Sequence, residues 1–96
     1  MLANLSENFC LTGGEVSFEQ AESLKTTGDR MISAQTTAIR MDLGELDRAN
    51  TLTVSLLIHW FRTAQQQNKS IVFVNLSQEL RNIIAFSGLN QVLLAD

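Results

Sequence analysis

The amino-acid sequence predicts a two-layer α/β sandwich, in which a mixed four-stranded sheet is covered by helices mainly on one face. Three helical segments alternate with short strands, so the predicted order is β-β-α-β-α-β-α. Strands joined through a helix pair in parallel, and the crossover is almost always right-handed. If successive strands are neighbours and advance in one direction, both connecting helices therefore lie on the same face. Residues 36–43 alternate between polar and apolar, which is typical of a strand buried on one face only.

The strands are predicted from short apolar stretches with polar or glycine boundaries. Residues 2–6 and 9–12 predict an N-terminal hairpin, and Gly13-Gly14 ends its second strand. Thr36–Leu43 is the alternating strand. Residues 71–74 read as a buried strand, because four apolar residues follow the break at Asn68-Lys69.

The helices are predicted from their caps and their apolar periodicity. Ser17 with Gln20 three residues later forms a capping box that opens the first helix. The second helix spans Thr51 to Gln67, and the third opens at Ser77 and closes at Gly88. The first helix carries one apolar stripe, predicted to face the core: Phe18, Ala21, Leu24, Gly28 and Met31 or Ile32.

Composition restricts the class of protein. Ninety-six residues predict one domain over residues 1–96. No apolar run approaches the roughly 20 residues needed to cross a bilayer, and the N-terminus lacks a signal-peptide pattern. The lone Cys10 excludes an internal disulfide and fits a reducing cytosol. A formal charge of −3 with scattered basic residues disfavours nucleic acid. We therefore expect a cytoplasmic domain with no direct membrane insertion.

The loop before the central helix is the first candidate site. It ends in Asn50-Thr51, and both residue types are favoured helix N-caps because a short side-chain oxygen accepts a free first-turn N–H. A hydroxyl at this positive end of the helix dipole is a natural place for a switch, since a phosphate there changes the charge in one step. The alternative is an ordinary strand–loop–helix connection with a good cap.

The central helix has more apolar surface than one core face needs. One stripe comprises Val54, Leu57, Ile58, Phe61 and Ala64, and a second comprises Leu52, Leu56 and Trp60. In one interpretation the helix is wedged between its neighbours and Trp60 covers an edge of the core. In the other, the second stripe is an exposed surface that continues from Thr51 and binds a partner.

Catalytic and metal sites find little support in the sequence. His59 is the only histidine, and no second ligand stands at zinc spacing. No G-x-S-x-G motif is present, and Gly13-Gly14 lacks the remaining residues of a nucleotide loop. Cys10 reads as a small core residue. The acidic residues Asp42, Glu45 and Asp47 could suggest a cation site, but no second acidic cluster completes it. They indicate a solvated turn. We expect no enzyme activity, no cofactor and no metal.

The strand, capped loop and apolar helix, in a chain of this length, resemble the STAS domain. The family signature at the start of the second helix is Asp-Ser-Ser/Thr-Gly, and the matching segment here is Asn50-Thr51-Leu52-Thr53. Thr51 keeps a hydroxyl, whereas Leu52 replaces the second one, which is the usual phosphorylation site in anti-sigma factor antagonists. A single Thr, a leucine run and a His are similar to the small STAS subunit of the Mla phospholipid transporter; here these are Thr51, residues 54–58 and His59.

The resemblance implies a STAS-like domain that acts by binding a partner. Its first implied partner is the cytosolic ATPase subunit of an Mla-type ABC transporter, which would place the domain at the inner face of the membrane. The alternative partner is an anti-sigma factor kinase. Thr51 is the residue at which phosphorylation is implied. The partner-binding residues expected from the loop and the second stripe are Asn50, Thr51, Leu52, Thr53, Leu56 and Trp60.

Overall fold

The computed structural model describes residues 2–5, 8–11, 16–35, 38–44, 46 and 48–86. Gly13-Gly14 and Gly88, predicted to end a strand and a helix, lie outside the described residues, as do Glu45 and Asp47. The strands are β1 (Leu2–Leu5), β2 (Asn8–Leu11), β3 (Ala38–Asp42) and β4 (Ser70–Val74). The helices are α1 (Phe18–Ala34), α2 (Thr51–Gln66) and α3 (Gln78–Phe86).

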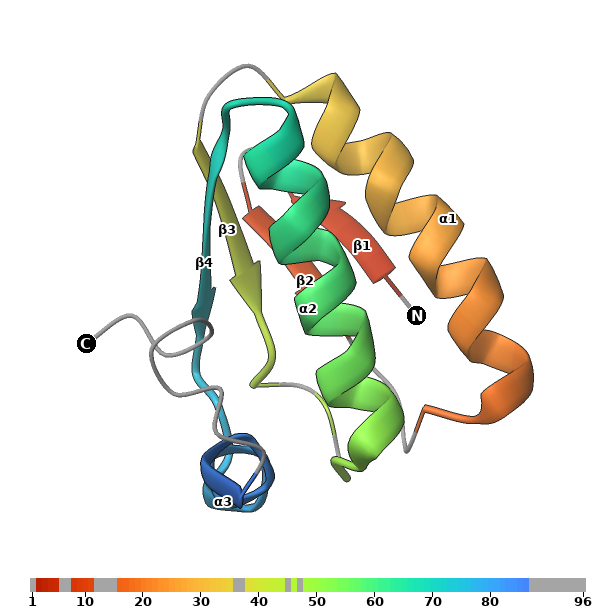
Figure 1. Cartoon of the computed structure of the whole chain (residues 1–96), viewed down its shortest axis with the longest axis vertical. Helices are drawn as coiled ribbons and strands as arrows, with labels where there is room; N and C mark the ends of the chain where they lie inside the picture. Colours follow the sequence, from red (N-terminus) through yellow and green to blue (C-terminus); the bar gives the residue numbers. More distant parts are fainter. Residues whose placement is uncertain are drawn as a thin grey trace.

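Strands that follow one another in the chain are also neighbours in the sheet, in the order β1-β2-β3-β4 (Figure 1). β2, β3 and β4 run parallel, while β1 pairs with β2 in the antiparallel direction. The predicted parallel pairing of strands joined through helices is confirmed.

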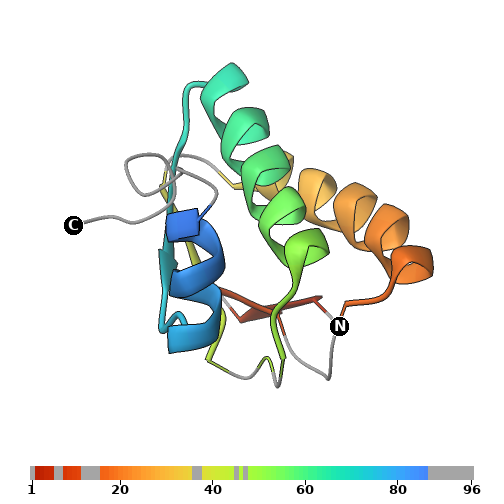
Figure 2. The ribbon, with the colours of Figure 1, turned by 60° about the horizontal axis from the view of Figure 1, so that its bottom comes forward.

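Helices α1 and α2 cover the same face of the sheet (Figures 1 and 2). Side chains of β3 and β4 alternate accordingly, with Ile39, Met41, Ile71 and Phe73 buried and the residues between them more exposed. α3 lies near the N-terminal end of α2, where the amide N–H of Ala49 donates to Glu79 Oε1 at 2.8 Å. No helix among the described residues is long and apolar enough to span a membrane.

Helix α1 is fixed at both ends by side chains. The predicted capping box is confirmed, because Ser17 Oγ accepts the Gln20 N–H at 3.2 Å and Gln20 Oε1 accepts the Ser17 N–H at 3.3 Å. At the other end Lys69 Nζ donates to the carbonyls of Ile32 and Ser33, at 2.8 and 3.0 Å. A cation bound to the last carbonyls of a helix complements its dipole.

Phe18, the first residue of the apolar stripe predicted for α1, does not face the core. Phe18 is 79% exposed, whereas Gly28 and Ile32 in the C-terminal half of the helix are buried. Val16, one residue before the N-cap, is 4% exposed. The chain therefore inserts Val16 rather than Phe18 into the core as it enters the helix.

Trp60 lies inside the core, so the interpretation that wedges α2 between its neighbours holds. Trp60 is 0% exposed and Leu56 2% exposed, and the prediction that they form an exposed strip is wrong. The indole fits because α1 passes it with Gly28, where an added Cβ would lie 2.7 Å from Cζ2 and closer still to Nε1 and Cε2. Its N–H donates to the Lys25 carbonyl at 3.3 Å, which satisfies the buried donor.

Candidate partner-binding site

The N-terminus of α2 is organised by Asn50. Its Oδ1 accepts the Thr53 N–H at 3.0 Å, and its own N–H donates to Thr53 Oγ1 at 3.3 Å, which completes a reciprocal capping box. The Asn50 Nδ2 donates to the Val16 carbonyl at 2.9 Å and so ties this loop to the segment before α1. Asn50 is thus held in place by contacts on both sides of the loop.

The residues predicted to bind a partner have different accessibility. Thr51 is exposed and Leu52 half-buried, at the start of a helix whose first turn carries no acidic residue. Thr53 is 0% exposed, and its hydroxyl is used in the cap. The Thr53 side chain is therefore not accessible at the surface in this conformation. Of the predicted set, Thr51 and Leu52 form the accessible part, with Asn50 partly buried behind them.

A groove of about 180 Å³ runs between α1 and α2, next to this helix end. Its lining combines apolar and polar side chains: Phe18, Ala21, Glu22, Lys25, Leu52, Ser55, Leu56 and His59. Leu52 belongs to both the predicted site and the groove. The groove is smaller than the roughly 300–1,000 Å³ of ordinary small-molecule sites. Its size suits a single side chain of a partner.

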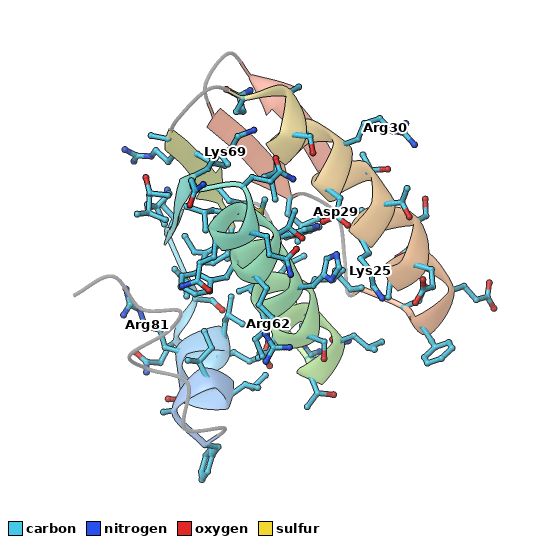
Figure 3. All side chains as sticks on the ribbon, turned by 45° about the horizontal axis from the view of Figure 1, so that its top comes forward. Lys25, Asp29, Arg30, Arg62, Lys69 and Arg81 are labelled. Carbon is cyan, nitrogen blue, oxygen red and sulfur yellow. The ribbon has the colours of Figure 1, made fainter. Side chains whose placement is uncertain are left out.

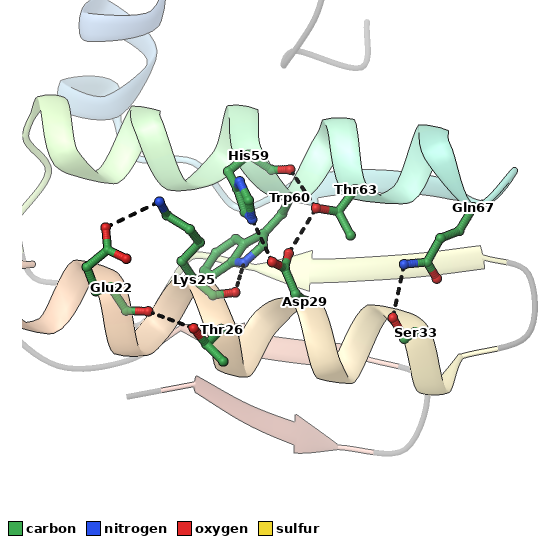
Figure 4. A network of polar contacts seen from close by, with 9 residues as sticks. All are labelled: Glu22, Lys25, Thr26, Asp29, Ser33, His59, Trp60, Thr63 and Gln67. Carbon is green, nitrogen blue, oxygen red and sulfur yellow. Dashed lines mark hydrogen bonds and ion pairs between the residues drawn. The ribbon is translucent and has the colours of Figure 1, made fainter.

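A polar network joins α1 and α2 at His59, which also lines the groove (Figure 4). His59 Nε2 lies 2.7 Å from Asp29 Oδ2, and Asp29 Oδ1 accepts the Thr63 hydroxyl at 2.9 Å. Figure 3 shows Lys25 and Asp29 between α1 and α2, whereas Arg30 extends away from α2. No local pattern in the sequence indicates this network, because His59 and Asp29 are 30 residues apart. The contact between His59 and Asp29 links α2 to α1, and both side chains are about one third exposed.

The acidic turn after β3 contains a small hydrogen-bonded corner. Asp42 Oδ1 accepts the Gly44 N–H at 2.8 Å and the Asn75 amide at 3.1 Å. The backbone bond from Gly44, followed by the bond from Asn75, lowers the pKa of the Asp42 carboxyl from its ordinary value of 3.8. No group of three or more His, Cys, Asp or Glu side chains suited to a metal gathers within the described ranges.

Known proteins resemble this chain over its whole fold. A chain of the Acinetobacter MlaFEDB complex in its ATP-bound Vtrans2 conformation is 28% identical, with a TM-score of 0.83. The match covers 97% of this chain and 96% of that one. The anti-sigma factor antagonist SpoIIAA in its unphosphorylated form has a TM-score of 0.76 at 19% identity, with 98% of this chain and 84% of that one covered. At this identity the second match shows the fold alone.

A third structure extends the same comparison. An anti-sigma factor antagonist of Mycobacterium paratuberculosis has a TM-score of 0.72 at 14% identity and covers 98% of this chain and 80% of its own. No curated protein sequence matches the chain. The family model described as "Mlab, STAS domain" matches residues 12–95. The matched residues include α1, β3, α2, β4 and α3. The chain is a member of the STAS domain family represented by Mlab.

Proposed function

We propose that this protein is a non-catalytic STAS subunit that binds and regulates the cytosolic ATPase of an Mla-type phospholipid ABC transporter. The observation that carries the proposal is the near full-length match, at 28% identity, to a chain of the ATP-bound MlaFEDB complex. The antagonists that share the fold are 19% identical or less in the structures compared above. Binding to such an ATPase would hold the domain in the cytoplasm at the inner face of the membrane.

The start of α2 is the surface we assign to the ATPase. Thr51 is exposed and Leu52 half-buried, and the cap formed by Asn50 and Thr53 holds their backbone in place without a partner. A preformed surface loses little conformational freedom on binding, which favours affinity. Trp60 supports this surface from inside the core, and Leu56 lines the floor of the neighbouring groove with almost all of its side chain buried.

We also place phosphate control at Thr51. Its hydroxyl is exposed at a helix N-terminus, where added negative charge is favourable to the free domain. Inside a complex the same charge would be desolvated and unpaired, so it would oppose binding. Leu52 offers no hydroxyl at the next position. A phosphate on Thr51 would thus release the partner without unfolding the domain.

The direct test is binding to the ATPase subunit encoded in the same genome. The two purified proteins are mixed, their complex is measured by titration, and ATP hydrolysis is followed with and without this protein. We expect a stoichiometric complex and a changed hydrolysis rate. Thr51→Glu should weaken the complex without lowering the melting temperature. Gln65→Glu, at an exposed position near the other end of α2, should leave the affinity unchanged.

Capture of an anti-sigma kinase, with no binding to the ATPase, would replace the transporter function by the antagonist function. Phosphorylation of Thr51 by that kinase, read by mass spectrometry, would then be the expected modification. Failure of both proteins to bind would refute the proposed function. Unchanged affinity of the Thr51→Glu variant would refute the assignment of this surface.

A further inference from the structure

We propose that Glu79 and Asn50 are positioning residues for the surface at the start of α2. Each side chain bonds the loop before this helix to a distant part of the chain, and together they hold Thr51 in place before a partner arrives. This inference rests on the proposed function for the identity of the partner. It adds the contacts by which the free domain keeps that surface in its binding position.

Glu79 reaches the loop from α3. Its Oε1 accepts the Ala49 N–H at 2.8 Å, although the two residues are 30 positions apart in the chain. Because Ala49 is 8% exposed, its N–H would have little access to water if this acceptor were removed. Glu79 Oε2 also lies 3.7 Å from Arg48 Nε, in a solvent-exposed pair that contributes little. The bond to Ala49 is therefore the contact by which Glu79 holds the loop.

Asn50 holds the same loop from the other side. Its Oδ1 caps α2 by accepting the Thr53 N–H, while its Nδ2 donates to the Val16 carbonyl at 2.9 Å. Val16 is itself fixed, because it is 4% exposed and is followed by the capping box of Ser17. A carboxylate at position 50 would still cap the helix, but it has no N–H to donate to Val16. Asn50 therefore makes a contact that the Asp of the family signature does not allow.

The start of α2 lies between α3 and the entry to α1 (Figures 1 and 2). The loop of residues 48–50 is thus bonded to α3 on one side and to the segment before α1 on the other. Thr51 and Leu52 follow this loop directly, so their positions depend on both bonds. A surface that is already in its bound position loses less conformational freedom on binding. Loss of either bond should therefore weaken binding without removal of any group of Thr51 or Leu52.

The bond from Glu79 can be tested first on the free protein, by amide hydrogen exchange followed by NMR. Glu79→Ala removes the acceptor of the Ala49 N–H, whereas Glu79→Gln keeps an oxygen at the same place and removes only the charge. We expect the Ala49 amide to exchange about tenfold faster or more in Glu79→Ala, and close to the wild-type rate in Glu79→Gln. An unchanged rate in Glu79→Ala, or an equal increase in both variants, would overturn the role of Glu79.

The second arm measures the Kd of the complex with the ATPase. Glu79→Ala should weaken binding about fivefold or more, and Glu79→Gln should restore nearly wild-type affinity, because the acceptor rather than the charge holds the loop. Asn50→Ser keeps an oxygen that caps α2 but cannot reach the Val16 carbonyl, so it should weaken binding by a similar factor.

Two control variants separate positioning from general effects on the fold. Glu19→Ala is matched to Glu79→Ala, because both residues are exposed acids in the first turn of a helix and both favour its dipole. Lys69→Met removes a cation at the far end of α1 and should lower the melting temperature. Both control variants should leave the Kd unchanged. A loss of affinity in Lys69→Met as large as that in Glu79→Ala would mean that stability alone sets the affinity, and would overturn the inference.

The two proposals fail differently. If the ATPase binds the wild type, Glu79→Ala and Asn50→Ser equally well, the positioning inference is overturned and the proposed function stands. If Glu79→Gln weakens the complex as much as Glu79→Ala, the charge acts directly on the partner and the positioning role of Glu79 is overturned. If the wild-type protein does not bind the ATPase, the proposed function fails, while the exchange rate of the Ala49 amide still decides whether Glu79 holds the loop.

Discussion

Gly28→Ala is the sharpest test of how α1 and α2 pack. In an exposed helix interior this change would stabilise by up to about 1 kcal/mol, because alanine has the higher helix propensity. Here the new Cβ would lie 2.7 Å from Cζ2 of Trp60, well inside van der Waals contact. The indole is 0% exposed and cannot swing into solvent.

Relief of this overlap is costly in either direction. Moving the indole stretches its hydrogen bond to the Lys25 carbonyl and leaves a buried donor under-satisfied, which costs about 1–3 kcal/mol. Moving α1 outward opens the core, and overpacking of this kind costs about 1–3 kcal/mol. After the propensity gain of up to about 1 kcal/mol is subtracted, we expect a net loss of about 0–2 kcal/mol. For a chain of this size each kcal/mol lowers the melting temperature by about 4–8 °C.

Thermal and urea unfolding measure the loss. Trp60 is the single tryptophan, so its fluorescence emission also reports displacement of the indole. Ser23→Ala, at an exposed position of the same helix, is the matched control and should stabilise by a few tenths of a kcal/mol. In Gly28→Ala combined with Trp60→Phe, the smaller ring should make the loss less than the sum of the single changes.

Two outcomes would refute this reasoning. Gly28→Ala could stabilise the protein as Ser23→Ala does, or the double-mutant cycle could show no coupling. Either result would mean that Gly28 is not what accommodates the indole. Trp60→Ala gives the upper limit of the effect, since removal of a buried large aromatic costs about 3–5 kcal/mol.

Three further predictions concern charges and caps. Lys69→Met should lower the unfolding free energy by about 1–2 kcal/mol, measured in urea, because the carbonyls of Ile32 and Ser33 lose their cationic donor. The pKa of Asp42 is lowered in the folded state, so the ionised carboxylate stabilises the fold above pH 3.8, and this stabilisation is lost as the pH falls through the folded-state pKa. Asp42→Asn should therefore make the unfolding free energy less dependent on pH on the acid side. Thr51→Ala should leave stability within about 1 kcal/mol and weaken the ATPase complex, while equal affinity would remove Thr51 from the interface.

The sequence by itself determined the local elements of this protein. Ser17 and Gln20 start α1, Asn50 caps α2, and the alternation around Ile39 and Met41 identifies a strand with one buried face. These signals are readable because caps and periodicities depend on residues within one turn or one strand. The STAS resemblance, stated from residues 50–53 and the order of elements, agrees with the family model that matches residues 12–95.

The hydrogen bond from the Asn50 N–H to Thr53 Oγ1 was not predicted from the sequence. A capping box usually has Glu or Gln at the third helical position, where this chain has Thr53. The sequence therefore predicted Thr53 only as part of the STAS signature, among the partner-binding residues. The spacing of three residues after Asn50 was the available signal. In this structure the Thr53 hydroxyl completes the cap and its side chain is buried.

Only the tertiary structure decided which apolar residues are covered. Two stripes on α2 allow either a wedged helix or an exposed one, and the choice depends on Gly28 of α1 leaving room for Trp60. The same packing joins His59 to Asp29 across 30 residues, and leaves Phe18 beside an open groove. Contacts of this range depend on how two helices approach each other on the sheet, which neither the periodicity nor the composition of one helix specifies.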